Sequence, residues 1–172
     1  LPGDVGVVSQ SGATGGGIVD GIIKQKIGVS YMVSTGNQMD LSVLDFLDLM
    51  VQDPGTNIIA SYMEGIPDFE GLKKVTSQAL RHHKPLIVMK SGKSDAGKKA
   101  AMSHTASLTG SNQVFEMAAR KLGIVLVDDL TEITDTIKVF RGQKRPNGKR
   151  VAAVVTSGAS GIMLADKLSE YG

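Results

Sequence analysis

Five short apolar runs, each followed by a stretch of helical periodicity, constrain the fold of this chain more than any other feature. The apolar runs are Val5–Ser9, Val29–Ser34, Ile58–Met63, Leu86–Lys90 and Ile124–Val127. The helical stretches are Thr14–Lys26, Leu41–Val51, Phe69–His82, Asn112–Leu122 and Leu130–Phe140. Strict alternation of this kind requires right-handed crossovers between parallel strands, with helices on both faces of the sheet. The pattern therefore predicts an α/β fold with a doubly wound, five-stranded parallel sheet.

Polar residues that suit helix starts precede the last four helical stretches. These predicted N-caps are Asp40, Asp68, Ser111 and Asp129. His82 and His83 close the third helical stretch, where cations suit the helix dipole, so we expect surface caps there. In parallel sheets ligands gather at the carboxyl ends of the strands, and the polar turns of this chain lie at that edge.

One of these turns occurs twice in the chain. Ser11-Gly12-Ala13-Thr14-Gly15 follows the first apolar run, and Ser157-Gly158-Ala159-Ser160-Gly161 follows Val151–Val155. A strand that enters a helix through such a turn leaves amide groups unpaired at the positive end of the helix dipole, where phosphate binds. The alternative is that Gly and Ser only serve the tight geometry of a strand–helix junction. Neither copy is a nucleotide P-loop or a complete GxGxxG motif.

The segment Arg141–Lys149 is polar and basic and contains no apolar side chain. We expect a first domain over residues 1–141, a linker over 142–149, and the truncated start of a second, similar domain over 150–172. Because no Met begins the chain and the second repeat stops after one helix, we expect an excised fragment. Its exposed strand and helix predict self-association or pairing with a partner.

Composition excludes several classes of function. The net charge is +2 and aromatic residues make up 4% of the chain, so nucleic acid is not an expected partner. The chain has no cysteine, which removes disulfides and thiol nucleophiles and fits a cytoplasmic location. No apolar stretch approaches the roughly 20 residues of a membrane-spanning helix, so no membrane is expected.

A long connection, residues 91–110, follows the fourth apolar run and contains a single histidine, His104, among small hydroxylated residues. Connections of this length are functional or mobile. Two interpretations stay open for His104: an incidental imidazole in a solvated loop, or a nucleophile or proton carrier. Glu64 ends the third run at the same sheet edge and either orients an imidazole or faces water. With no cysteine and no clustered histidines, no metal site is predicted.

Several motifs together resemble the nucleoside-diphosphate-forming acyl-CoA synthetases, a superfamily that includes succinyl-CoA synthetase and ADP-forming acetyl-CoA synthetases. They are Val7-Val8-Ser9-Gln10-Ser11-Gly12-Ala13, Tyr62-Met63-Glu64-Gly65, Lys90-Ser91-Gly92 and Ser103-His104-Thr105-Ala106-Ser107-Leu108. They occur in the correct order across Gly3–Phe140, and the likeness continues from Arg150 onward. The resemblance implies a flavodoxin-like domain followed by the first βα unit of a second one.

The resemblance also implies an activity and its residues. Such enzymes form acyl-CoA from a carboxylic acid and CoA while ATP or GTP is cleaved to the diphosphate and phosphate, through an acyl phosphate and a phosphohistidine. His104 matches the phosphorylated histidine, and Glu64 matches the carboxylate that positions it. Two helix starts match those that hold the phosphoryl group without a metal: Ser11, Gly12 and Ala13, and Ser157, Gly158 and Ala159.

The same resemblance sets the expected cofactors and partners. No cofactor is bound permanently, and CoA and ATP/ADP or GTP/GDP with Mg are co-substrates of the full enzyme. They bind through CoA-binding and ATP-grasp domains or a subunit that this chain lacks, so the fragment alone is expected to be inactive and to function in a homo- or hetero-oligomer. Ala106 stands where the family usually has Gly. The resemblance implies no particular acid and no choice between ATP and GTP.

Two alternatives belong to other functional classes. One is an acyl-CoA-sensing regulatory module of a protein lysine acetyltransferase, since some of those enzymes carry the same domains. The retention of His104 and Glu64 favours catalysis over this alternative. The other is a flavodoxin-like protein that binds flavin or another phosphate ligand, against which the low aromatic content argues.

Overall fold

The computed structural model describes residues 1–66, 68–94, 96, 97, 99, 112–142, 148 and 150–171. The chain divides into two compact units, Leu1–Gly142 and Gln143–Gly172. Most of the predicted linker lies outside the described residues. Within the part of the chain that is described, every helix is too short or too polar to cross a membrane.

The first unit is built on a five-stranded sheet in the order β2-β1-β3-β4-β5, and every neighbouring pair is parallel. The strands are β1 Pro2–Ser9, β2 Val29–Ser34, β3 Ile58–Met63, β4 Leu86–Lys90 and β5 Val125–Val127. This order is that of flavodoxin-like folds. The predicted doubly wound parallel sheet is confirmed, and the bounds of β2, β3 and β4 are those predicted.

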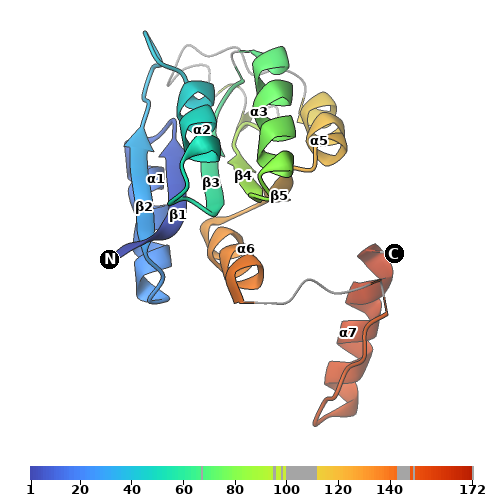
Figure 1. Cartoon of the computed structure of the whole chain (residues 1–172). Helices are drawn as coiled ribbons and strands as arrows, with labels where there is room; N and C mark the ends of the chain where they lie inside the picture. Colours follow the sequence, from blue (N-terminus) through green and yellow to red (C-terminus); the bar gives the residue numbers. More distant parts are fainter. Residues whose placement is uncertain are drawn as a thin grey trace. The chain divides into compact units, whose positions relative to one another are not determined.

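Helices cover both faces of this sheet (Figure 1). They are α1 Gly12–Lys24, α2 Val43–Gln52, α3 Phe69–Arg81, α5 Asn112–Lys121 and α6 Leu130–Gly142. One buried cluster joins α2, α3 and α5 to the sheet, and a second joins α1 and α6 to the opposite face. In β1 the side chain of Val8 belongs to the first cluster, and those of Val5 and Val7 to the second. This division follows from the alternation of side chains along a strand.

The helix caps agree with the sequence prediction at two of four positions. Asp68 caps α3, and Asp129 accepts backbone hydrogen bonds at the start of α6. Ser111 lies outside the described residues. The prediction of Asp40 is wrong: Ser42 caps α2, because its hydroxyl accepts from the first turn while the Asp45 carboxylate accepts from the Ser42 amide, a capping box.

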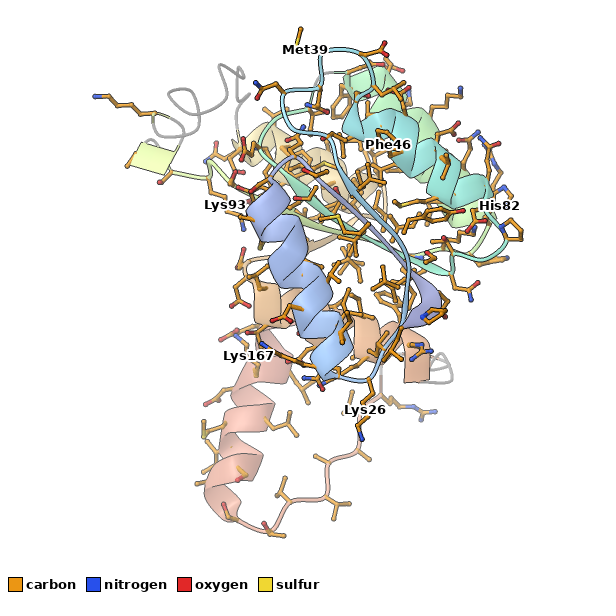
Figure 2. The ribbon with its side chains drawn as sticks, turned by 90° about the vertical axis from the view of Figure 1, so that its left-hand side faces the viewer. Lys26, Met39, Phe46, His82, Lys93 and Lys167 are labelled. Carbon is orange, nitrogen blue, oxygen red and sulfur yellow. The ribbon has the colours of Figure 1, made fainter. Side chains whose placement is uncertain are left out.

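The third predicted helix ends as expected, with His82 as the C-cap of α3 and both His82 and His83 exposed. Figure 2 shows His82 on the outside of the molecule at this helix end. The first helix begins at Gly12 rather than at the predicted Thr14 and ends at Lys24, because Lys26 adopts a left-handed conformation with φ 59°. The duplicated turn is therefore already part of the helix.

The second unit contains one described helix, α7, Gly158–Tyr171. The run Val151–Val155, predicted as a strand, forms none. A strand needs a neighbour to accept and donate its ladder hydrogen bonds, and the described residues of this unit supply no second strand. Only the helical half of the repeated βα unit is formed here.

Candidate functional site

The turn between β1 and α1 is fixed by the buried side chain of Ser9. Its hydroxyl donates to the carbonyl of Ser11 over 2.6 Å and accepts from the amide of Ser11 over 3.1 Å. These two bonds close the turn on itself. The start of α1 is therefore held at the carboxyl end of β1, at the edge where ligands bind in such sheets.

Ser11 is the N-cap of α1. Its hydroxyl accepts from the amide of Thr14 over 3.3 Å, and its carbonyl accepts from the amide of Gly15 over 2.9 Å. Gly12 and Ala13 precede the start of this helical ladder, and both are exposed. Their amides point out of the N-terminus of a 13-residue helix, an arrangement that suits an anion.

The second copy of the turn repeats this geometry. The hydroxyl of Ser157 accepts from the amide of Ser160 over 3.2 Å, and its carbonyl accepts from the amide of Gly161 over 3.3 Å. Gly158 and Ala159 are again exposed at the helix start. The sequence repeat is therefore also a repeat of capping geometry.

Glu64 follows the last residue of β3 and is only 9% exposed. Its Oε1 accepts from the hydroxyl of Tyr62 over a long 3.5 Å. Its Oε2 is buried, and no donor in the described part of the chain reaches it. Burial raises the pKa of the Tyr62 phenol above its usual value, and the Glu64 carboxylate adds to this effect, so Tyr62 stays a neutral donor. A buried carboxylate oxygen without a donor is costly and indicates a missing partner.

Gln10 connects the first turn with Glu64, a role that the sequence analysis did not assign. Its Oε1 accepts from the amides of Glu64 over 2.5 Å and Gly65 over 3.1 Å, and its Nε2 donates to the carbonyl of Gly65 over 2.9 Å. The Gln10 amide donates to the carbonyl of Tyr62. The Ser11 turn and Glu64 are thus brought side by side. The sequence signals for Gln10 were its polar side chain directly after an apolar strand and its place in the motif Val7–Ala13.

Lys90 ends β4 on the other side of β3 and is 5% exposed. Its Nζ donates to the carbonyl of Glu64 over 3.1 Å and to the carbonyl of Ser91 over 2.8 Å. The ammonium group also lies 5.8 Å from the ring centre of Phe115, within cation–π range. The site edge therefore contains a buried lysine ammonium group next to the main chain of Glu64.

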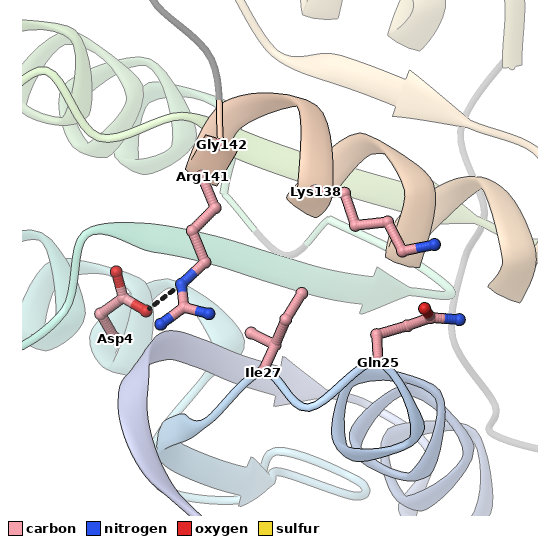
Figure 3. Close-up of a pocket in the computed structure, with 6 residues that line it drawn as sticks. All are labelled: Asp4, Gln25, Ile27, Lys138, Arg141 and Gly142. Atoms are coloured by element: carbon pink, nitrogen blue, oxygen red, sulfur yellow. Dashed lines mark hydrogen bonds and ion pairs between the residues drawn. The ribbon is translucent and has the colours of Figure 1, made fainter.

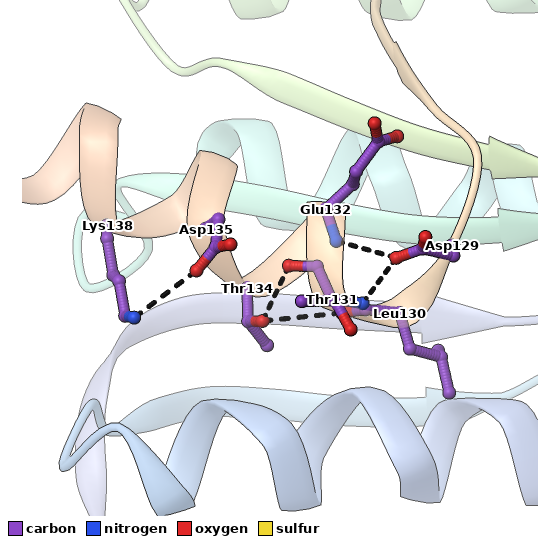
Figure 4. Close-up of polar contacts among 7 residues, drawn as sticks. All are labelled: Asp129, Leu130, Thr131, Glu132, Thr134, Asp135 and Lys138. Atoms are coloured by element: carbon purple, nitrogen blue, oxygen red, sulfur yellow. Dashed lines mark hydrogen bonds and ion pairs between the residues drawn. The ribbon is translucent and has the colours of Figure 1, made fainter. Parts of the chain in front are cut away.

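Lys93, at the beginning of the long connection, forms an ion pair with Asp128. Asp128 lies just before α6, and its amide donates to Glu132 over 2.6 Å. The Asp129 carboxylate accepts from the amides of Thr131 and Glu132 over 2.7 and 2.8 Å, so the start of α6 is occupied by its own acidic residues (Figure 4). This helix start is consequently not open to an anion, in contrast to that of α1.

His104 and the rest of residues 100–111 lie outside the described residues. Among those that are described, no group of three His, Asp or Glu side chains could hold a metal ion. A pocket of about 540 Å³ lies at the opposite, amino end of the sheet and contains none of the predicted site residues (Figure 3). It is lined by Asp4, Gln25, Ile27, Lys138, Arg141 and Gly142.

Comparisons with known proteins identify the fold and its relatives. Residues 2–140 match the family model of the succinyl-CoA ligase like flavodoxin domain. Subunit alpha of acetate–CoA ligase [ADP-forming] II from Pyrococcus furiosus is 38% identical over 99% of this chain. The 4-hydroxybutyrate–CoA ligase [ADP-forming] of Nitrosopumilus maritimus is 34% identical over 98% of it.

Among solved structures, the dinucleotide forming acetyl-coenzyme A synthetase 1 of Ca. Korarchaeum cryptofilum, in complex with phosphate and ADP, matches with a TM-score of 0.88. It is 33% identical, and the match covers 99% of this chain and 37% of that one. The chain likewise spans 37% of the length of the Pyrococcus subunit and 24% of the length of the Nitrosopumilus ligase. The strand order, the turn motifs and these matches agree, and the chain belongs to the family of succinyl-CoA-ligase-like flavodoxin domains.

Proposed function

We propose that this chain is part of an ADP-forming acid–CoA ligase and that His104 carries a phosphoryl group between two reaction steps. The relatives named above are ADP-forming CoA ligases of different acids, which supports the reaction class and leaves the acid open. In the direction of acyl-CoA formation, ATP phosphorylates the histidine and ADP leaves. The phosphohistidine then transfers its phosphoryl group to the acid carboxylate, and the CoA thiol displaces phosphate from the acyl phosphate.

The observation that carries this proposal is the buried Oε2 of Glu64, which lacks a donor among the described residues. A carboxylate can accept from one N–H of an imidazole, which fixes the tautomer and leaves the other nitrogen free to attack phosphorus. Glu64 lies at the sheet edge from which the long connection with His104 departs. We infer that His104 supplies the missing donor to Glu64.

The charge on the phosphoryl group has to be balanced as well. A phosphoryl group bears roughly two negative charges. The exposed amides of Gly12 and Ala13 at the start of α1 supply donors and the positive end of a helix dipole. We propose that Gly158 and Ala159, with Ser157 as their cap, supply the second such helix start. No metal is needed at the histidine in this arrangement.

The remaining substrates bind elsewhere in the complete enzyme. The chain spans 37% of the Pyrococcus subunit and 24% of the Nitrosopumilus ligase, so we assign CoA and the nucleotide with Mg to additional domains or a partner subunit. The Pyrococcus relative is named a subunit alpha, which supports assembly with a second kind of subunit. We expect residues 1–172 alone to lack ligase activity.

The experiment labels the complete protein, with any subunit it requires, using ATP that carries a radioactive γ-phosphate. We expect a protein-bound label that is stable to base and labile to acid, absent from His104→Ala and reduced in Glu64→Gln. An acid-stable label, or a label that persists in His104→Ala, contradicts the proposal. Serine and threonine phosphates resist acid, so the chemistry of the label separates them from phosphohistidine.

A further inference from the structure

The main chain around Glu64 is held from both neighbouring strands. β3 lies between β1 and β4 in the sheet, and each neighbour contributes one buried polar side chain to the end of β3. Gln10, which follows β1, makes three hydrogen bonds to Glu64 and Gly65. Lys90, from β4, donates to the carbonyl of Glu64. Main-chain atoms of Glu64 are therefore fixed by contacts that do not involve its own carboxylate.

Gln10 differs from Lys90 in what it connects. It directly precedes Ser11, the cap of the helix start proposed to hold the phosphoryl group, and it is only 7% exposed. Its Oε1 accepts two hydrogen bonds and its Nε2 donates one, all with the main chain of Glu64 and Gly65, which follow β3. A side chain with one donor and one acceptor group on the same residue pair determines both the distance and the orientation of that pair.

We propose that Gln10 is a positioning residue that sets the Glu64 carboxylate relative to the anion-binding turn at Ser11. This inference rests on the proposed function and adds a residue to it. Gln10 does not touch the phosphoryl group or the imidazole in this assignment. It acts through Glu64, because a carboxylate that is displaced by about 1 Å orients the imidazole poorly, and such displacements cost about 100-fold in rate.

The test is a double-mutant cycle in the complete protein, with the rate of His104 phosphorylation by ATP as the readout. Gln10→Met has a similar length and removes all three hydrogen bonds, and we expect it to slow phosphorylation about 10- to 100-fold. If Gln10 acts through Glu64, the same substitution in a Glu64→Gln background costs less than about 3-fold. Equal losses in the two backgrounds overturn the inference, since a purely structural role acts in both.

A second variant and a matched control keep the test decisive. Gln10→Glu keeps the acceptor for the two amides and loses the donor to Gly65, so it serves if Gln10→Met does not fold, with the same expected dependence on Glu64. Gln38→Met is the control: the Gln38 side chain accepts from the amide of Val43 over 2.7 Å at the start of α2, and the hydrogen bonds of Glu64 involve other residues. We expect Gln38→Met to leave phosphorylation unchanged; a loss as large as that of Gln10→Met contradicts the inference.

Failure of the inference and failure of the proposed function give different results. If the wild-type protein takes no phosphate on His104, the proposed function is wrong and the inference falls with it. If the wild type is phosphorylated and Gln10→Met is phosphorylated at the wild-type rate, only the role of Gln10 is wrong. Unfolding by urea, measured on each variant, shows whether a lost rate follows a lost fold.

Discussion

Two adjacent glycines in α1 provide a sharp test of how this helix packs on the sheet. A Cβ on Gly15 would lie 2.4 Å from Cε of Met32 and 2.9 Å from Cβ of Ser9. A Cβ on Gly16 would meet nothing within 4 Å. Gly15→Ala and Gly16→Ala thus make the same chemical change one residue apart in the same helix, and only the first creates a contact.

The expected magnitudes follow from these contacts. Replacing a helical glycine by alanine stabilises a helix by about 1 kcal/mol, and this gain is shared by both variants. Met32 can move its terminal methyl at small cost, whereas Cβ of Ser9 is fixed to β1, so helix and strand must separate. Overpacking of this kind costs about 1–3 kcal/mol. We expect the free energy of unfolding of Gly16→Ala to be about 1 kcal/mol above that of the wild type. We expect it to be about 2 kcal/mol above that of Gly15→Ala.

The assay is urea denaturation of the 172-residue chain, followed by circular dichroism. With a urea dependence of about 2 kcal/mol per molar, the two midpoints should differ by about 1 M. The difference between the variants cancels the propensity gain and isolates the contact with Ser9. If Gly15→Ala unfolds at the same urea concentration as Gly16→Ala or at a higher one, α1 does not pack on β1 as described.

Three further outcomes are expected. Ser11→Ala removes the cap of α1 and should lower the free energy of unfolding by about 1 kcal/mol in the same urea assay, whereas Ser11→Asp, which keeps an acceptor, should lose little. Lys84→Met removes the ammonium donor to the carbonyls of Met50 and Asp53 at the end of α2 and should cost about 1 kcal/mol; an unchanged urea midpoint would show that these bonds do not stabilise the fold. Burial raises the pKa of Tyr62 above its ordinary value of 10.0, so the unfolded chain ionises first: the stability from the neutral phenol is complete below pH 10.0 and is lost as the pH rises through the folded value. Between pH 8 and pH 10.5 the free energy of unfolding should therefore fall more in the wild type than in Tyr62→Phe. Equal falls in the two proteins would contradict the raised pKa of Tyr62.

The sheet could be predicted because its signals are local. Each of β2, β3 and β4 is an apolar run bounded by turn residues, and the bounds follow from the run itself. β1 extends further than predicted, to Pro2, because Pro2 pairs with Val29 of the neighbouring strand. Such a pairing depends on a residue far along the chain and leaves no mark in the local pattern.

The site could be predicted only in part for the same reason. The positions of Ser11 and Glu64 at the sheet edge follow from motifs and strand ends. The bonds from Gln10 to Glu64 and Gly65 span 54 and 55 residues, so no local pattern shows them. The run Val151–Val155 shows the converse: its local pattern is that of a strand, but a strand requires a partner.

The most direct test of the central claim is to locate the phosphate. The complete protein is phosphorylated with ATP, digested at neutral or mildly basic pH to preserve phosphohistidine, and analysed by peptide mass spectrometry with fragmentation. We predict phosphate on His104, none in His104→Ala, and a lower fraction of phosphorylated peptide in Glu64→Gln. Phosphate on Ser103 or Thr105 instead, or full phosphorylation of His104 in Glu64→Gln, would contradict the account.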